Sequence, residues 1–323
     1  MPAVASGVPE LNRALLAGSA NPALAAAIAA KLGLVPLRRI VARFPDSELH
    51  VELQDSVRGA DLFILQPTSP PADQHIIELL LLADAARRAG AARVTGVIPY
   101  FAYARQDRRA TGREPVGARV IADALASAGR FDRIIAVDLH SSALEGFFGV
   151  PLEHLSAVSL LAEALRPHVT PASVVVAPDL GAVRLAERYA DGLGLPVAIV
   201  HKTRLSGAAV EVRALTGEVR NRRPVIVDDM ISTGSTIGAA VQALRQAGAR
   251  QETVVAATHG LFVGDAALLL HQLSLRTLLV TDSIQGADLS ELPIQRVSIA
   301  GLLADAVSRL HRGESLGDLI AHR

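Results

Sequence analysis

The chain has 323 residues, half of them hydrophobic and only 3% aromatic, so its core must consist mainly of Ala, Leu, Val and Ile. A formal charge of zero argues against a nucleic-acid surface that works by counterion release, and the absence of cysteine excludes disulfides, thiol catalysis and cysteine metal sites. The length favours two α/β domains, and neither a secretory signal nor a bilayer-spanning stretch is visible, so we expect a cytoplasmic protein that binds no nucleic acid and no membrane.

The first polar cluster in chain order precedes an alternating run over residues 49–53. Phe44, Asp46 and Glu48 alternate with Pro45 and Ser47. An exposed phenylalanine flanked by acids is suited to stack on an adenine and accept a hydrogen bond from its amino group. A β-turn that packs its own phenylalanine fits the same residues, and both interpretations stay open.

The next segment has the order of a βαβ unit. Residues 61–66 form an apolar strand, a helix follows through Ala89, and a second strand covers residues 94–98. The loop 67–73 after the first strand contains three prolines, which lack the amide donors that a phosphate cradle needs. We therefore expect no sugar-phosphate site in this unit.

A cationic loop follows the strand over residues 94–98. Three arginines lie within five residues and a fourth comes shortly after: Arg105, Arg108, Arg109 and Arg113. Guanidinium groups bind phosphate oxygens in pairs, so the loop suits a nucleotide triphosphate. A solvated loop in which Asp107 and Glu114 pair with the arginines is equally compatible with the sequence.

Two further strands end in residues that are able to carry chemistry. His140 follows the strand over residues 134–137, where it suits a Mg²⁺ ligand, a phosphate donor or a capping side chain. Asp179 follows the strand over residues 174–176, and a single aspartate before a helix is typical of an N-cap.

Lys202 and Arg204 follow a strand over residues 197–200. Alternate residues of an extended segment point the same way, so the two cations share a face. Paired positive charges suit the stabilisation of a migrating phosphoryl group. An exposed basic flank of a hairpin is the alternative, because Gly207 comes soon after.

The strongest motif spans residues 225–236. A β-branched strand ends in Asp228 and Asp229, and small and hydroxylated residues then open a helix. Ligands of open α/β sheets bind at this end of a strand, and small residues let backbone N–H groups converge on a phosphate. The two acids suit sugar hydroxyls or Mg²⁺. The plainer alternative is a strand end with an acidic cap and a threonine-rich first turn.

The second half of the chain repeats the order of the first. Its strand over 225–227 is followed by a helix through Ala247 and a strand over 253–257, and both helices end in the pattern Arg-X-Ala-Gly-Ala, at 88–92 and 245–249. Each half then adds a strand ending in aspartate, over 134–138 and 278–282. Strands that alternate with helices indicate parallel sheets. We predict an α/β fold of two tandem, doubly wound parallel-sheet domains related by duplication, over residues 1–155 and 156–323.

Taken together, these motifs resemble the ribose-phosphate pyrophosphokinase (phosphoribosyl pyrophosphate synthetase) family. The likeness runs from about residue 44 to residue 314 and includes residues 66–68, 105–108, 112–115, 138–140, 178–179, 228–236 and 258–260. The resemblance implies two phosphoribosyltransferase-type domains. It also implies Mg²⁺-dependent transfer of pyrophosphate from ATP to the 1-hydroxyl of ribose 5-phosphate, with AMP as the by-product.

The resemblance also assigns roles to the candidate residues. It implies that Lys202 and Arg204 stabilise the transferring group, and that His140 and Asp179 are the metal-linked positions. The expected ATP-binding residues are Phe44, Asp46, Glu48, Arg105, Gln106 and Asp107. The expected ribose 5-phosphate site consists of Asp228, Asp229, Ser232, Thr233, Gly234, Ser235 and Thr236. In the family the adenine hairpin reaches a neighbouring subunit, so a homo-oligomer with a shared active site is expected.

Two other functions remain as alternatives. A phosphoribosyltransferase would share the motif at 228–236 but would not need the duplicated domain or the arginine loop. A non-catalytic homologue that regulates active synthetases would be indicated by lost catalytic cations or a broken sugar loop. Neither loss is present in the sequence.

Overall fold

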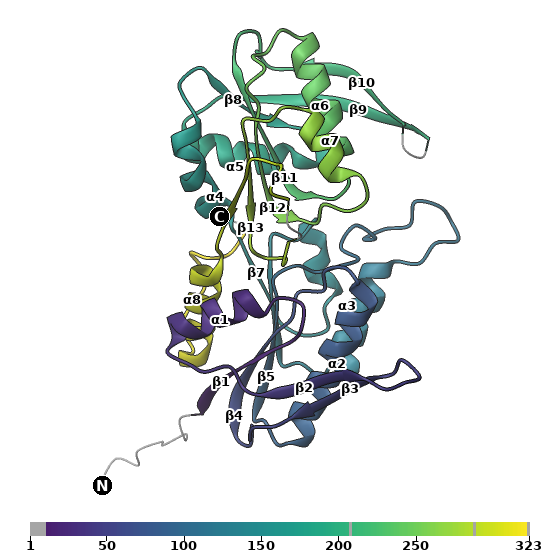
Figure 1. Ribbon diagram of the computed structural model, residues 1–323, viewed down its shortest axis with the longest axis vertical. Helices are drawn as coiled ribbons and strands as arrows, with labels where there is room; N and C mark the ends of the chain where they lie inside the picture. Colours follow the sequence, from purple (N-terminus) through teal and green to yellow (C-terminus); the bar gives the residue numbers. More distant parts are fainter. Residues whose placement is uncertain (1–10, 207–208, 287–288, 322–323) are drawn as a thin grey trace. The chain divides into compact units, whose positions relative to one another are not determined.

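The computed structural model describes residues 11–206, 209–286 and 289–321, with the side chains of residues 202–213 outside the described part. The chain forms two compact units (Figure 1). Unit 1 comprises Met1–Ala136, Ser141–Glu153 and Leu303–Asp318, and unit 2 comprises Val137–His140, His154–Leu302 and Leu319–Arg323. The sequence analysis placed residues 303–318 in the second domain, whereas by their contacts they belong to unit 1.

Unit 1 is built on a five-stranded sheet with the order β1-β4-β5-β6-β7. Its first four strands pair in parallel. All six residues of β4 are buried, as expected for a parallel strand covered on both faces. The strands are β1 (Asn12–Ala17), β4 (Ala60–Leu65), β5 (Arg93–Ile98), β6 (Arg133–Val137) and β7 (Leu152–Leu155), and the helices are α1 (Pro22–Leu32), α2 (Ala72–Arg88) and α3 (Gly117–Ser127).

The later part of helix α8 (Ala300–Arg312) is held to unit 1 by a buried carboxylate. Asp61 is fully buried and accepts hydrogen bonds from Arg93 Nε at 2.6 Å and from His311 Nδ1 at 2.8 Å. A buried carboxylate needs such partners, because leaving it unpaired is costly. These long-range contacts explain why a segment near the end of the chain packs with the first unit.

Unit 2 is built on a seven-stranded sheet with the order β10-β9-β8-β11-β12-β13-β14. The strands pair in parallel from β9 to β14, and β10 is an antiparallel edge strand. The strands are β8 (Ser173–Ala177), β9 (Val197–Ser206), β10 (Ala209–Thr216), β11 (Arg223–Ile231), β12 (Val254–Gly260), β13 (Thr277–Thr281) and β14 (Ile294–Val297).

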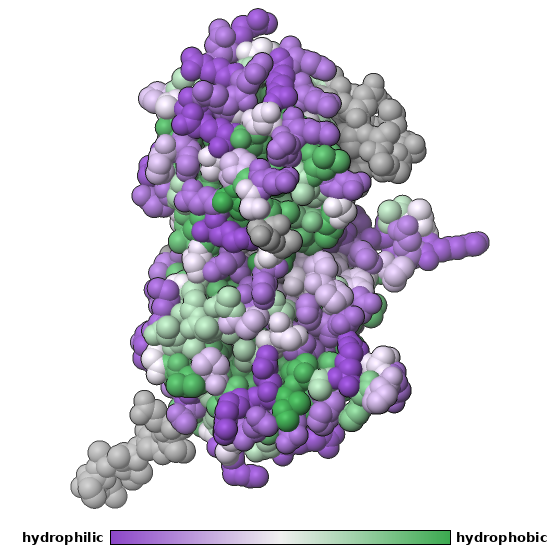
Figure 2. All heavy atoms as spheres, viewed as in Figure 1, coloured by the Kyte–Doolittle hydropathy of each residue, from purple (hydrophilic) through white to green (hydrophobic). Residues whose placement is uncertain are grey.

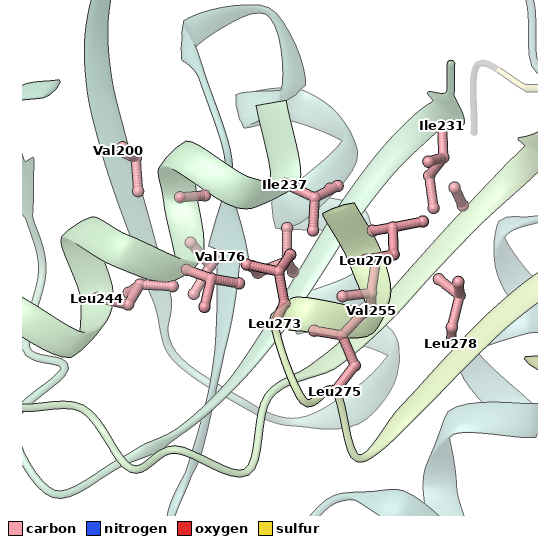
Figure 3. Close-up of a cluster of buried hydrophobic side chains, with 14 of the residues drawn as sticks. Val176, Val200, Ile231, Ile237, Leu244, Val255, Leu270, Leu273, Leu275 and Leu278 are labelled. Atoms are coloured by element: carbon pink, nitrogen blue, oxygen red, sulfur yellow. The ribbon is translucent and has the colours of Figure 1, made fainter. Parts of the chain in front are cut away.

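Helices cover both faces of this sheet, so it is doubly wound. Successive residues of β8 alternate between two cores: Val174 and Val176 pack in one, and Val175 and Ala177 in the other. The first core includes residues of α6 (Ser235–Gln246) and α7 (Ala266–Gln272), and Figure 3 shows Ile237, Leu244 and Leu270 around it. The second core includes residues of α4 (Val158–Leu165) and α5 (Val183–Leu193).

The strand that carries the paired acids is longer than predicted. The sequence analysis ended it at Val227, whereas β11 continues through Ile231, so both acids lie within the strand. The reason is that Met230 and Ile231 are buried and pair with His259 and Gly260 of β12. The loop therefore begins at Ser232.

On the face shown in Figure 2, hydrophilic residues surround smaller groups of hydrophobic ones. In the described part of the chain, no helix combines the length and apolar character needed to cross a membrane.

Candidate active site

The paired acids of β11 have opposite electrostatic environments. Removal from water raises the pKa of Asp228 well above its ordinary value, and the charge of neighbouring Asp229 and then that of Asp179 act in the same direction. Burial also opposes ionisation of Asp229, but the hydrogen bond and charge of His140 outweigh it, so the pKa of Asp229 is lowered. The strand therefore presents two different acids. The ionised form of Asp229 is stabilised by His140, whereas the ionised form of Asp228 is disfavoured by burial and by neighbouring acids.

The two predicted metal-linked residues lie with these acids in unit 2. His140 donates from Nδ1 to Asp229 Oδ2 at 2.7 Å. Asp179 precedes the short helix η3 (Leu180–Ala182) and accepts from the N–H of Gly181 at 3.0 Å and of Ala182 at 3.3 Å, as an N-cap does. It nevertheless influences Asp228, so the capping role predicted for a lone aspartate and a place in the acid cluster both hold.

The donor set is compatible with a hard divalent cation. Among the described residues there is no group of three or more His, Asp or Glu side chains arranged to hold a metal ion alone. Mg²⁺ usually binds one or two carboxylates and completes its coordination with substrate phosphates and water, so a full protein cage is not needed. The raised pKa of Asp228 marks a place where added positive charge would be stabilising.

The loop after β11 has the geometry of an anion cradle. Gly234 adopts the left-handed conformation with φ 77° immediately before α6, whose first N–H groups have no partners within the helix. The Thr233 and Ser235 hydroxyls lie 3.1 Å apart. A phosphate at this position would meet hydroxyl donors and the positive end of the helix dipole.

Two leucines of helix α7 pack against the backbone of this loop and of the first turn of α6. A Cβ atom added at Gly234 would lie 3.3 Å from Leu270 Cγ, and one added at Gly238 would lie 3.2 Å from Leu269 Cδ2. Glycine at both positions lets the leucines approach the backbone at the start of α6. The sequence analysis identified Gly234 but not this contact.

The predicted adenine hairpin is present in unit 1. The strands β2 (Arg39–Arg43) and β3 (Leu49–Leu53) pair antiparallel, and residues 44–48 form the turn between them. Asp46 Oδ1 accepts from the N–H of Glu48 at 3.1 Å. Phe44 remains 49% exposed although its ring centroid is 5.1 Å from that of His50. The turn exists, and it leaves much of Phe44 accessible to a ligand.

The arginine loop leads into α3, also in unit 1. The Asp107 side chain is largely buried and pairs with Arg108, whereas Glu114 accepts from the N–H groups of Ala110 and Thr111. The Gln106 side chain lies against Gly117, where an added Cβ would approach it to 2.4 Å. In the described part of the chain, the side chains of Arg105 and Arg113 form no ion pair or hydrogen bond. The salt-bridged alternative therefore holds for Arg108 alone among these arginines.

The predicted catalytic cations lie on β9. This strand runs continuously from Val197 to Ser206 and pairs with β10, so Lys202 and Arg204 are in a hairpin, as the sequence suggested. Their side chains lie outside the described residues, and their catalytic role stays a prediction.

A buried polar network near His140 was not assigned from the sequence. Asp138, Thr258 and His259 are all buried and are linked by hydrogen bonds. The available signal was a Thr-His pair at the end of an otherwise apolar strand. It gave no role because the partner residue is 120 positions away in the chain.

Comparisons with known proteins show what the chain is similar to. Residues 13–129 match the N-terminal domain of ribose phosphate pyrophosphokinase, residues 160–260 a phosphoribosyl transferase domain and residues 212–321 a phosphoribosyl synthetase-associated domain. The chain is 40% identical over 303 residues to a ribose-phosphate pyrophosphokinase of Staphylococcus aureus, covering 93% of this chain and 94% of that protein. It is also 40% identical over 308 residues to the corresponding protein of Bradyrhizobium diazoefficiens, covering 94% of this chain and 96% of that protein. The crystal structure of phosphoribosylpyrophosphate synthetase from Mycobacterium smegmatis superimposes with a TM-score of 0.86 at 38% identity, covering 94% of this chain and 99% of that one.

Proposed function

We propose a catalytic assignment that starts from one premise: the chain belongs to the ribose-phosphate pyrophosphokinase family. Its reaction is the formation of phosphoribosyl pyrophosphate. We assign ATP as the pyrophosphate donor, the 1-hydroxyl of ribose 5-phosphate as the acceptor and AMP as the by-product. The observation that carries the assignment is the pairing of Asp229 on β11 with His140, on the strand that leads into the anion cradle at the start of α6.

The sugar site in this proposal lies entirely in unit 2. Asp228 and Asp229 accept hydrogen bonds from the ribose hydroxyls. The loop from Ser232 to Thr236 holds the 5-phosphate through hydroxyls and backbone N–H groups. Fixing the sugar at both ends orients its 1-hydroxyl for in-line attack, which contributes to the rate through alignment rather than covalent chemistry.

Nucleotide binding is assigned to residues of unit 1, and stabilisation of the transferred group is assigned to cations of β9. Arg105, Gln106 and Asp107 bind the phosphates, and Phe44, Asp46 and Glu48 bind the adenine. The two β9 cations, Lys202 and Arg204, stabilise the pyrophosphoryl group as its charge redistributes. The support for the nucleotide loop is Arg105, which is exposed and forms no ion pair or hydrogen bond within the residues that the structure describes.

Mg²⁺ is the proposed cofactor, with His140, Asp179 and the β11 acids as the nearby protein groups. When bound, it would supply charge neutralisation for the phosphates. The residues support this role because their carboxylates are hard oxygen donors, and the Asp228 carboxyl is destabilised in its charged form without a cation.

We further propose that the two units contain phosphoribosyltransferase-type domains that arose by duplication. Support comes from hydrogen bonds repeated at the ends of α2 and α6. The N–H groups of Gly90 and Gly248 both donate to the carbonyl three residues earlier at 3.0 Å, and both glycines have positive φ, at 89° and 81°. The carbonyls of these two glycines then accept from Gly59 and Asn221, which are also left-handed.

The working unit is proposed to be a cytoplasmic homo-oligomer whose active site is shared between subunits. The support is the half-exposed Phe44 at a hairpin tip, because aromatic side chains are enriched in protein interfaces. A phosphoribosyltransferase and a non-catalytic regulator remain the competing functions.

One incubation separates the proposed synthetase from the two other functions, and a second, with phosphoribosyl pyrophosphate and a base, separates those two from each other. Purified protein is mixed with ATP, Mg²⁺ and ribose 5-phosphate, and AMP release is followed. We expect AMP and phosphoribosyl pyrophosphate in equal amounts, with no AMP when ribose 5-phosphate is omitted. Asp229→Ala serves as the matched inactive control. A phosphoribosyltransferase would instead consume phosphoribosyl pyrophosphate with a base, and a non-catalytic regulator would release no AMP.

A further inference from the structure

The turn that carries His140 is held in an unusual backbone conformation. Asp138, two residues before His140, is a non-glycine residue with φ 38° and is only 6% exposed. Left-handed backbone costs free energy for a residue with a Cβ atom, so surrounding contacts must hold it. These contacts all lie within unit 2.

The carboxylate of Asp138 makes several of the contacts that hold this turn. Its Oδ1 accepts from Ser156 Oγ at 2.8 Å, and its Oδ2 accepts from the N–H of Ala157 at 2.9 Å and from Thr258 Oγ1 at 2.7 Å. Ser156 Oγ in turn accepts from Arg188 at 2.9 Å. Both oxygens of this buried carboxylate therefore accept hydrogen bonds from within the protein, and these bonds hold the turn.

The backbone on either side of Asp138 is fixed as well. His259 Nε2 donates to the carbonyl of Val137 at 3.0 Å, and the N–H of Leu139 donates to His154 Nε2 at 2.8 Å. Three consecutive residues before His140 are therefore tied by buried side chains. Thr258 and His259 lie on β12, the neighbour of β11, which carries Asp229.

These contacts connect the backbone before His140 to the strand next to Asp229, and both residues are proposed active-site groups. The β11–β12 register places Met230, next to Asp229, opposite His259, while Thr258 and His259 hold the turn that leads to His140. The 2.7 Å hydrogen bond between His140 and Asp229 then joins the two groups directly. Resting on the proposed function, we infer that Asp138 and Thr258 are positioning residues that align His140 with Asp229 for pyrophosphoryl transfer.

The test removes a hydroxyl without changing shape. In Thr258→Val we expect kcat to fall about tenfold or more, the effect of losing a hydrogen bond to a charged group, with a smaller change in the KM values. Thr258→Ser keeps the hydroxyl and should restore kcat. Thr253→Val is the matched control, since Thr253 is equally buried just before the start of β12 and has no contact with Asp138.

A second readout does not depend on activity. In protein labelled with ¹⁵N-histidine, the ring resonances of His140 are assigned by comparison with His140→Gln. Thr258→Val should shift them as the hydrogen bond to Asp229 weakens, and Thr258→Ser and Thr253→Val should not. If Thr258→Val does not fold, Ser156→Ala removes another donor to Asp138 and is judged by the same two measurements.

The proposal is overturned if Thr258→Val keeps both the kcat and the His140 resonances of the unsubstituted protein. It is also overturned if Thr253→Val produces the same loss, or if Thr258→Ser fails to restore kcat. Failure of the proposed function looks different. In that case the unsubstituted protein releases no AMP, while the resonances of His140 still report whether Thr258 positions the ring.

Discussion

Two neighbouring carboxyl groups behave differently because only one is hydrogen-bonded to a histidine. Asp229 is hydrogen-bonded to His140, whereas Asp228 faces the charges of Asp229 and Asp179. Carboxyl groups that lie close together cannot all ionise without a free-energy cost, because their negative charges repel. This unfavourable grouping of acids lies in the proposed sugar site, where the proposed function requires carboxylates.

Substitution of Asp228 should therefore stabilise the free protein. A carboxyl with a raised pKa holds its proton more tightly in the folded state, so it becomes destabilising as pH rises from the unfolded toward the folded pKa. We expect Asp228→Asn to raise the free energy of unfolding at neutral pH and to change it little in acid. Urea unfolding at both pH values, without substrates, measures the effect.

Asp229→Asn provides the opposite control. Its carboxyl has a lowered pKa in the folded state, so its stabilising contribution is present above the unfolded pKa and is lost as pH falls through the folded one. At neutral pH this variant should be less stable than the unsubstituted protein. A shift of both variants in the same direction would refute the assigned pair.

Lys202 should act mainly in the transition state. We expect Lys202→Ala to lower kcat about a hundredfold or more, because loss of electrostatic stabilisation in a shielded site costs a few kcal/mol. ATP binding, followed by calorimetry, should weaken far less. Unchanged kcat in the folded variant would remove Lys202 from the catalytic role.

At the scale of elements, the phosphate loop depends on packing between two helices. Gly234 is left-handed and lies against Leu270 of α7, and Gly238 lies against Leu269 of the same helix. The loop conformation is therefore fixed by a contact made 30 or more residues later in the chain.

Gly234→Ala should damage the sugar site. The added Cβ needs a left-handed backbone and meets Leu270 at 3.3 Å, so the loop must shift. We expect the KM for ribose 5-phosphate to rise about tenfold, in line with the loss of one or two kcal/mol of binding. Steady-state kinetics with ribose 5-phosphate varied at saturating ATP measures the change.

Gly194→Ala separates backbone strain from the effect on the site. Gly194 is left-handed with φ 66° after α5, and an added Cβ there meets nothing within 4 Å. It should cost stability, by roughly 1 kcal/mol, without changing the KM for ribose 5-phosphate. Equal effects of the two variants on KM would show that the loop has no special role.

At the scale of the whole molecule, we expect residues of two subunits to complete each active site. Asp46→Ala and Asp229→Ala should each be inactive alone, since one affects the adenine hairpin and the other the sugar site. When subunits are exchanged between them, some sites should regain both functions, and activity should return to a fraction of the unsubstituted level. The AMP-release assay on mixed oligomers measures the recovery.

Subunit exchange must itself be demonstrated, for example by fluorescence transfer between labelled subunits. Exchange without recovered activity would mean that each chain builds its site alone. Re-mixing two samples of the same variant provides the background.

The sequence by itself determined the alternating order of strands and helices, the acid pair of β11 and the cradle of small residues after it. These features are local, because strand periodicity, glycine and threonine after a strand, and proline-blocked loops act over a few residues. The predicted strands and helices consequently lie close to the observed ones, with β11 extended by the partners that Met230 and Ile231 find on β12.

Only the tertiary structure decided which distant groups meet. The partners of Asp138 on β12, the pairing of His140 with Asp229 and the attachment of α8 through Asp61 join residues 89 to 250 positions apart. These hydrogen bonds, and the lowered pKa of Asp229, depend on burial and on distance in space, which a single sequence does not encode locally. Residue types were therefore enough to predict a chemistry for the site, while the alignment of its groups depended on how the sheet brings strand ends together.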